Sequence, residues 1–283
     1  RFDAVMESLS LNNYCFVGAG GHDTDGALSL LSTPCLRRVA ACMTGFARTL
    51  GERSVYTGIS TLLQVERASG SCVDLFAVVR HGSGDTLKGQ RGKVPTNASA
   101  AAIEALTRAS DYAHWEDPGD KAEFRHCGLP CTARFAKMAR CAELMRLRER
   151  KETFRYDWAV HMRPDIQLNA PRAITSMGLR KGAVYQDAKY HDLLVYASRE
   201  LLNATTERPS SFPCDKLPPT RARNHLDITC EALLLASIRE AGVRILTHRI
   251  GAKMVRTPEA RALIARTGVV KLHGKEYGKV RTS

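Results

Sequence analysis

The residues best suited to chemistry follow a short apolar run near the middle of the chain. Asp165 follows the apolar run 156–162 after two intervening residues, Arg163 and Pro164. A carboxylate at a strand end, next to an arginine, is placed to hold a divalent cation on a diphosphate, because Mg²⁺ and Mn²⁺ combine few protein carboxylates with phosphate oxygens. Such a cation would neutralise charge on a leaving diphosphate. A Pro-Asp turn whose carboxylate caps backbone amides is the alternative interpretation.

A second set of candidate residues follows the apolar run 39–43. Thr44, Gly45 and Arg48 stand there, and open α/β sheets bind their ligands at the carboxyl ends of the strands. We therefore expect these three residues to line a nucleotide pocket. Arg163 is explained either by a bound diphosphate or by pairing with Asp165, since both would keep a half-buried guanidinium charged.

Two histidines lie near these segments. His161 is four residues before Asp165, and in a strand both side chains would share one face. His161 is therefore either a second metal ligand or a hydrogen-bonded histidine beneath the site. The same alternatives hold for His191, which immediately precedes Asp192.

The elements that must position these residues alternate between strand and helix. Short apolar runs predict strands, and apolar residues at helical spacing predict helices. For example, Phe135, Met138, Ala142 and Met145 form one apolar stripe. Strands are expected at residues 39–43, 73–79, 112–115, 156–162, 184–185, 193–196, 243–246 and 252–255, and helices at 55–69, 98–109, 132–150, 198–204 and 229–241.

This alternation predicts an α/β fold with a mostly parallel sheet flanked by helices. Residues 1–35 are expected to be a lead-in or stem segment, in which the glycines at 18, 20 and 21 only loosely resemble a phosphate loop. Residues 36–256 form the expected domain, and residues 257–283 a basic, peripheral tail. Residues 80–96 are expected to be a basic loop, either solvated or acting as a lid, and residues 209–219 a Pro/Ser loop.

Composition limits the class of protein further. The 283 residues carry 42 Lys+Arg against 29 Asp+Glu, a net charge of +13, and 44% are hydrophobic. A packed core is therefore expected, and collagen-like or disordered classes are not. The apolar helical stretch 232–238 is too short to cross a bilayer. The positive charge suits phosphate-bearing ligands, but few aromatic residues and no nucleic-acid-binding motif argue against nucleic acid as the main partner.

The nine cysteines include no CxxC pair, so a structural zinc site is not expected. Cys127 and Cys131 flank a Gly/Pro turn that could hold a small disulfide loop. Cys42, Cys141 and Cys230 stand in apolar patterns and are interpreted as buried thiols. Sequons begin at Asn97 and Asn203 and permit a secretory location.

One stretch resembles a known family. Residues 139–168, ARCAELMRLRERKETFRYDWAVHMRPDIQL, resemble the centre of a GT-A-like nucleotide-sugar glycosyltransferase family in which an R/C-rich helix precedes the motif YDWVVRxRPD. In the same order, residues 41–49, 73–76, 191–201 and 231–243 are similar to further segments of that family, so the resemblance spans about residues 38–256. His161 replaces the motif's first arginine, and one carboxylate stands where many metal-dependent members have DxD.

The resemblance implies a GT-A-like domain that moves a sugar from a nucleotide-diphosphate donor to a hydroxyl group of a glycan or glycoconjugate. It implies Mn²⁺ or Mg²⁺ as cofactor, with Asp165 as metal ligand and Thr44, Gly45, Arg48 and Arg163 binding the donor. An inverting reaction needs a carboxylate base, for which Glu231 and Asp192 are the candidates. A retaining reaction would need no dedicated base.

Two other functions stay open on the sequence. One is a catalytically inactive glycan-binding domain on the same fold, and the other is a basic nucleic-acid-binding protein. In a eukaryote the expected location is the Golgi or secretory lumen, and a membrane anchor could lie upstream of residue 1.

Overall fold

The computed structural model describes residues 15–16, 35–47, 49–80, 96–117, 132–187, 194–216, 230–248, 252–254, 269–272 and 275–279. The elements are β1 (Cys15–Phe16), β2 (Arg37–Phe46), α2 (Arg53–Ala68), β3 (Ser71–Arg80), α3 (Thr96–Ala109), β4 (Tyr112–Glu116), α4 (Thr132–Lys151), β5 (Trp158–Met162), β6 (Ile166–Leu168), β7 (Ala183–Asp187), β8 (Leu194–Ser198), η2 (Arg199–Leu201), α5 (Leu202–Thr206), α6 (Arg208–Ser211), η3 (Cys214–Lys216), α7 (Cys230–Glu240), β9 (Arg244–His248), β10 (Ala252–Met254), β11 (Val269–Leu272) and β12 (Lys275–Lys279). Within this described part, no helix has the length and apolar character to cross a membrane.

An eight-stranded sheet forms the centre of the molecule, with the strand order β1-β4-β3-β2-β5-β8-β7-β9. Strands β2 to β5, β7 and β9 run in one direction, and β1 and β8 run in the other. The fold is therefore α/β with a mostly parallel sheet flanked by helices, which confirms the predicted fold class and agrees with a GT-A-like arrangement.

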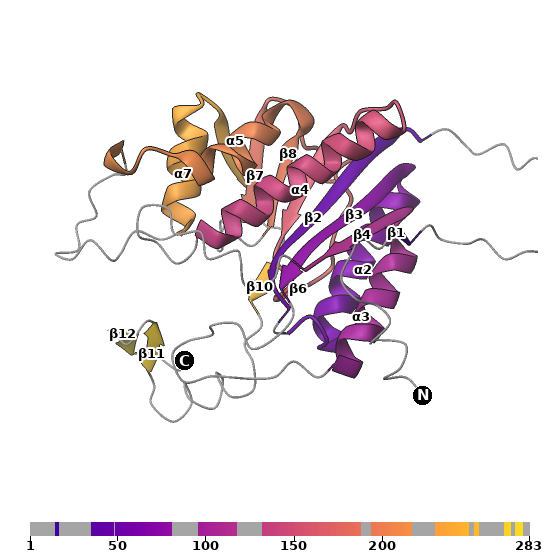
Figure 1. The fold of residues 1–283 in the computed structure, drawn as a ribbon, viewed down its shortest axis with the longest axis horizontal. Helices are drawn as coiled ribbons and strands as arrows, with labels where there is room; N and C mark the ends of the chain where they lie inside the picture. Colours follow the sequence, from indigo (N-terminus) through magenta and orange to yellow (C-terminus); the bar gives the residue numbers. More distant parts are fainter. Residues whose placement is uncertain are drawn as a thin grey trace, which may run out of the picture.

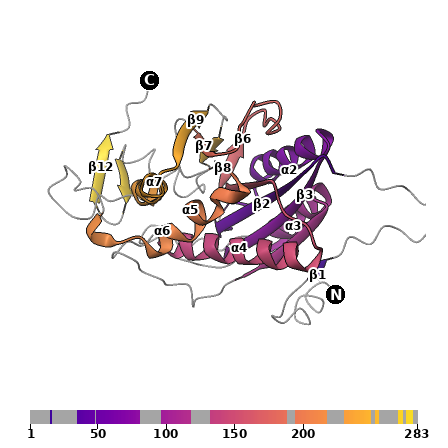
Figure 2. The same ribbon diagram turned by 90° about the horizontal axis from the view of Figure 1, so that it is seen from above.

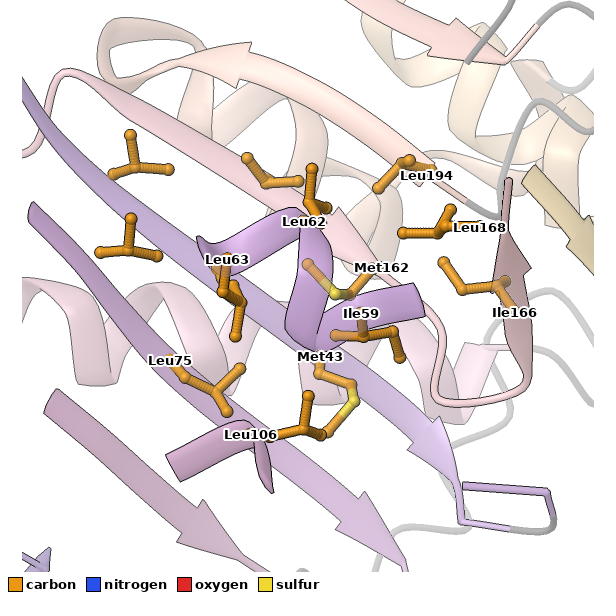
Figure 3. Close-up of a cluster of buried hydrophobic side chains, with 14 of the residues drawn as sticks. Met43, Ile59, Leu62, Leu63, Leu75, Leu106, Met162, Ile166, Leu168 and Leu194 are labelled. Atoms are coloured by element: carbon orange, nitrogen blue, oxygen red, sulfur yellow. The ribbon is translucent and has the colours of Figure 1, made fainter. Parts of the chain in front are cut away.

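Helices cover both faces of this sheet (Figures 1 and 2). Helices α2 and α3 lie on one face, and α4 to α7 lie on the other. The side chains of β2 alternate accordingly, because successive residues of a strand point to opposite faces. Val39, Ala41 and Met43 pack in the core under α2 and α3, whereas Ala40 and Cys42 pack under α4. Figure 3 shows the larger core, where Leu62 of α2 meets the sheet.

Two disulfides correct the cysteine assignments. Cys42 of β2 is bonded to Cys141 of α4, with their Cα atoms 6.2 Å apart, and Cys35 is bonded to Cys72 of β3. The interpretation of Cys42 and Cys141 as buried thiols is therefore wrong. Both positions are apolar because strand and helix bury them against each other, and that same packing brings the two sulfurs together. The side chain of Cys230 and the Cys127–Cys131 turn lie outside the described residues.

Several short elements differ from the expectation. Strand β10 does not close the main sheet but pairs antiparallel with β6, a strand of three residues that the pattern did not predict. Helix α6 begins at Arg208 and extends into the expected Pro/Ser loop, because a proline is tolerated in the first turn of a helix. Strands β11 and β12 pair with each other within the expected tail. The glycines at 18, 20 and 21 and residues 81–95 lie outside the described part.

Candidate functional site

The strand order reverses between β2 and β5. From β2 the chain continues outward through β3 to β4, and α4 then brings it back to β5 on the other side of β2. Ligands of open α/β sheets bind at the carboxyl ends of the strands at such a switch point. Met43 of β2 pairs with Met162 of β5. Thr44 and Gly45 were expected to follow a strand at residues 39–43, but β2 continues to Phe46 and contains both of them. The last residues of β2 lie beside residues 163–165, which follow β5.

The two segments are in contact at Gly45. Its φ is +145°, and a Cβ atom built there would lie 3.0 Å from Cδ of Pro164. A residue with a side chain would be strained by this φ and would press on the proline ring. Gly45 therefore allows the ends of β2 and β5 to approach closely. A valine at this position would displace Pro164 whether or not a donor binds, so it does not test donor binding cleanly.

Arg163 and Asp165 form a two-point ion pair across the turn after β5. Arg163 donates from Nε to Oδ1 of Asp165 at 2.7 Å and from Nη2 to Oδ2 at 2.6 Å. Asp165 is only 3% exposed. Ile166, the next residue, is buried in the core against α2 and fixes the turn from the other side. Of the two partners predicted for Arg163, the structure contains the carboxylate.

Asp165 fits a divalent cation only together with oxygens from a ligand. Among the residues that the structure describes, no three His, Cys, Asp or Glu side chains gather into a metal-binding group. A cation at Asp165 would share the carboxylate with Arg163 or displace one of its hydrogen bonds. One carboxylate plus phosphate oxygens is nevertheless a donor set that Mg²⁺ accepts, so the residues present fit a cation carried by a diphosphate.

His161 is fully buried in β5, and neither ring nitrogen has a hydrogen-bond partner among the residues that the structure describes. It faces α4, as does Ala159 two residues earlier. Burial, helped by the charge of Arg134, lowers the pKa of His161 to about 3. The imidazole is therefore neutral near pH 7. The sequence offered two interpretations of His161, a metal ligand or a hydrogen-bonded histidine beneath the site. The second is wrong for the described residues, because the ring has no hydrogen bond there.

Within the described part of the chain, other buried polar groups near the carboxyl ends of the strands also lack hydrogen-bond partners. The hydroxyl of Thr44 is one of them, although this residue is 0% exposed. Oε1 of Gln186 in β7 and the hydroxyl of Thr49 are two more. Each unpaired buried group costs about 1–3 kcal/mol. This edge of the sheet therefore holds hydrogen-bonding capacity that the fold itself does not use.

Three of the predicted site residues are not placed with their side chains. Arg48 and Asp192, with its neighbour His191, lie outside the described residues. Glu231 is the second residue of α7, and only its place in the helix is described. Because α7 ends just before β9 begins, its last turn lies toward the amino edge of the sheet and its first turn, with Glu231, lies toward the carboxyl edge, which is the side predicted for Glu231. The choice between Glu231 and Asp192 as base stays a prediction.

Two further residues at this edge were not among the candidates from the sequence. Lys137 of α4 is 3% exposed, and its ammonium lies 4.7 Å from the ring centroid of Phe46. Its position four residues before Cys141, on the side of α4 that faces the sheet, was the available signal. Asp187, at the end of β7, is also buried and accepts a hydrogen bond of 3.4 Å from the backbone N–H of Ala252. That contact attaches β10 to the main sheet.

No protein-family model matches the chain, and no curated protein matches it. The structure thus defines an α/β protein of the open-sheet class with a polar site at its switch point.

Proposed function

We propose that the chain is a glycosyltransferase that moves a sugar from a nucleotide-diphosphate donor to a hydroxyl group of a glycan or glycoconjugate. The observation that carries the proposal is the buried ion pair of Arg163 with Asp165 at the switch point. The pair ends the segment that resembles the glycosyltransferase motif. It also stands where open α/β sheets bind nucleotides.

In this proposal the residues at the ends of β2 and β5 have different roles. Arg163 turns from Asp165 toward the diphosphate, and Asp165 holds Mg²⁺ or Mn²⁺ together with phosphate oxygens. The cation would supply charge neutralisation of the leaving diphosphate. The free hydroxyl of Thr44 donates a hydrogen bond to the donor. Glu231 or Asp192 accepts the proton of the attacking hydroxyl if the reaction inverts.

A thermal-unfolding screen of nucleotide sugars with and without Mn²⁺ tests the proposal. A ligand that binds only the folded state raises the free energy of unfolding, by about 2.7 kcal/mol when its concentration is one hundred times its Kd. The unfolding temperature rises accordingly. We expect one donor to stabilise the chain, and to do so more with Mn²⁺ than without. Stabilisation by none of the nucleotide sugars or nucleoside diphosphates would contradict the proposal.

A catalytically inactive glycan-binding domain is the second candidate function. The observation that favours it is the engagement of both oxygens of Asp165 by Arg163. If the pair is only structural, the chain will bind glycans but will neither transfer sugar nor hydrolyse a donor. Glycan-array binding combined with a donor-hydrolysis assay separates the two functions.

We also propose the secretory lumen as the location if the source is eukaryotic. Two disulfides support an oxidising compartment. Asn203, which begins a sequon, is exposed on α5. Peptide N-glycosidase should lower the apparent mass of protein taken from its native cell. An unchanged mass together with a cytosolic distribution would contradict this location.

A further inference from the structure

Exposed basic side chains stand at the amino edge of the main sheet, the edge at which its parallel strands begin. Arg150 and Lys151 are the last residues of α4, Arg155 precedes β5, and Arg180 precedes β7. In Figure 1 the end of α4 lies beside the start of β2. Within the described part of the chain, no ion pair involves the charged groups of these four side chains. Their charges are therefore open to a ligand.

The carboxylates that stand in the same segments are already engaged. Each of them accepts a hydrogen bond of 3.0 Å or less, namely Glu152 from Arg148, Asp157 from Lys181 and Glu200 from Ser198. Two of the three thus have a cation of their own, and the third has a hydroxyl. The four further cations leave this part of the edge with an excess of positive charge.

The segments that carry these cations lie side by side. Asp157, two residues after Arg155, accepts a hydrogen bond of 3.0 Å from the backbone N–H of Arg38 at the start of β2. It accepts another of 3.0 Å from Nζ of Lys181, which directly follows Arg180. The start of β2, the start of β5 and the turn before β7 are therefore joined at one carboxylate.

The cations are spread along the edge and do not surround one point. Strands β5, β8 and β7 are neighbours in the sheet, so the segments before β5 and β7 are two strand spacings apart, about 10 Å. The end of α4 extends the row on the side of β2 (Figure 1). A single small anion cannot contact cations so far apart, whereas a linear chain with anionic groups at intervals can.

We propose that Arg150, Lys151, Arg155 and Arg180 form a binding surface for an acidic polysaccharide, a glycan chain that carries carboxylate or sulfate groups. The guanidinium groups can bind carboxylate or sulfate oxygens through two parallel hydrogen bonds. Binding of a linear polyanion stands on the placement of the cations. That this polyanion is the acceptor glycan rests on the proposed function, because the surface lies at the edge opposite the candidate site.

Two observations favour a polysaccharide over a nucleic acid. Single-stranded nucleic acids stack their bases on open aromatic rings. The ring next to Arg155 is that of Phe154, but the guanidinium carbon of Arg38 lies 4.0 Å from its centroid, and the ring of Tyr156 meets it nearly at a right angle. The two disulfides also argue against the cytosol and the nucleus, the compartments of nucleic acids.

Dextran sulfate and dextran test the proposal, because they share one backbone and differ only in the sulfate groups. Calorimetric titration measures the binding of both at several salt concentrations. We expect the wild type to bind dextran sulfate and not dextran, with an affinity that falls as salt rises, since ion pairing to a polyanion releases counterions. Dextran sulfate that binds no more tightly than dextran overturns the proposal.

A quadruple variant, Arg150→Gln, Lys151→Gln, Arg155→Gln and Arg180→Gln, removes the four charges at exposed positions. It should bind dextran sulfate about tenfold more weakly, because several small contributions from exposed ion pairs are lost together. Its salt dependence should be shallower, since fewer counterions are released. Its unfolding temperature should equal that of the wild type. Wild-type affinity in a folded quadruple variant overturns the proposal.

Arg155→Gln and Arg53→Gln form a matched pair that separates a surface from net charge. Both arginines are exposed and have no ion pair within the described residues, but Arg53 begins α2, which follows β2, and so lies at the carboxyl edge. Only Arg155→Gln should weaken the binding of dextran sulfate. Equal losses in the two variants would show that the polymer responds to net charge alone, and the proposed surface would be wrong.

Two further polymers identify the chemistry of the ligand. Polygalacturonate carries carboxylates, so its affinity relative to dextran sulfate shows which acidic group the surface prefers. An oligothymidylate that binds more tightly than both polysaccharides, and loses this affinity in the quadruple variant, overturns the choice of a polysaccharide. If no nucleotide sugar or nucleoside diphosphate stabilises the chain, the proposed function fails while the results with these polymers keep their meaning.

Discussion

The parallel strands of the main sheet begin at one edge, the amino edge, and end at the other, the carboxyl edge. The two edges differ in how their buried polar groups are hydrogen-bonded. At the amino edge, Asp74 accepts a hydrogen bond of 2.6 Å from the hydroxyl of Tyr156 and one of 3.4 Å from Nε of Arg148. Glu149 accepts two hydrogen bonds of 2.7 Å from Arg199 and one from the backbone N–H of Tyr156. These groups form a network in which each charge is matched.

The carboxyl edge has no such network among its fully buried neutral groups. Thr44 and His161 are entirely buried there and have no hydrogen-bond partner among the described residues. Away from this edge, the comparable exceptions in the described part of the chain include one guanidinium nitrogen of Arg37 at the amino edge and the fully buried hydroxyl of Tyr196, on which the charge of Glu66 acts. Since natural proteins satisfy most buried polar groups, departures are expected at functional sites. The difference between the edges is consistent with the proposal that the buried groups of the amino edge mainly stabilise the fold and that the carboxyl edge binds a ligand.

The largest effect on stability should come from removing the Cys42–Cys141 disulfide, which joins α4 to β2. In the chain-entropy account, a disulfide between residues 99 positions apart contributes about 5 kcal/mol, and one between residues 37 apart about 4 kcal/mol. The double variant Cys42→Ala, Cys141→Ala should therefore lose more stability in denaturant titration than Cys35→Ala, Cys72→Ala. The reverse order would show that α4 is held mainly by its apolar contacts.

Asp165→Asn and Asp157→Asn make the same chemical change at opposite edges. We expect Asp165→Asn to lower sugar transfer at least about a hundredfold, as the loss of a group that stabilises developing charge does. Asp157 accepts a hydrogen bond from the backbone N–H of Arg38 and pairs with Lys181. Asp157→Asn should thus lower the unfolding temperature and leave transfer unchanged. If Asp165→Asn transfers sugar at the wild-type rate, the proposed role of Asp165 as a metal ligand is wrong.

The pH dependence of stability should reveal the charge of Lys137. Burial and Arg80 place the folded-state pKa of this lysine below its ordinary 10.5. Between the two pKa values the unfolded chain binds more protons, so stability rises with pH there. Lys137→Met should consequently be at least as stable as the wild type at pH 7, and its advantage should shrink as the pH approaches 10.5. Denaturant titrations of both proteins across this range measure the difference, and a large loss in Lys137→Met at pH 7 would mean that the charge is structural.

The sequence predicted the regular elements well because their apolar patterns are local. The run 39–43 lies within β2, and the apolar stripe of residues 135–145 lies within α4. Strand β6 was not predicted because three residues are too few to show an alternating apolar pattern. It is a strand because it pairs with β10, which is distant in the sequence. The disulfide partner of Cys42 depends on how α4 packs on β2, which no local pattern contains.

The candidate site was predictable in part. Residues 44–45 and 163–165 were identified because they follow apolar runs in the sequence, although residues 44–45 lie within β2. The contact between Gly45 and Pro164 could not be predicted, since it depends on the β2–β5 register. Lys137 was missed because a lysine within a helix is ordinarily solvated, and only the packing of α4 shows that it is buried.

The smallest change, Thr44→Val compared with Tyr156→Phe, tests the difference between the edges most directly. Each variant removes one buried hydroxyl. Tyr156→Phe takes a hydrogen bond from Asp74 and should cost about 1–3 kcal/mol of stability without affecting ligand binding. Thr44→Val removes a hydroxyl without a partner, so stability should stay the same or rise by up to about 1 kcal/mol, while affinity for the best nucleoside diphosphate should fall about tenfold. The measurement is the unfolding free energy and the diphosphate Kd of both variants. If Thr44→Val is clearly less stable than the wild type and its affinity for the nucleoside diphosphate is unchanged, the proposal that the carboxyl edge binds the ligand is contradicted.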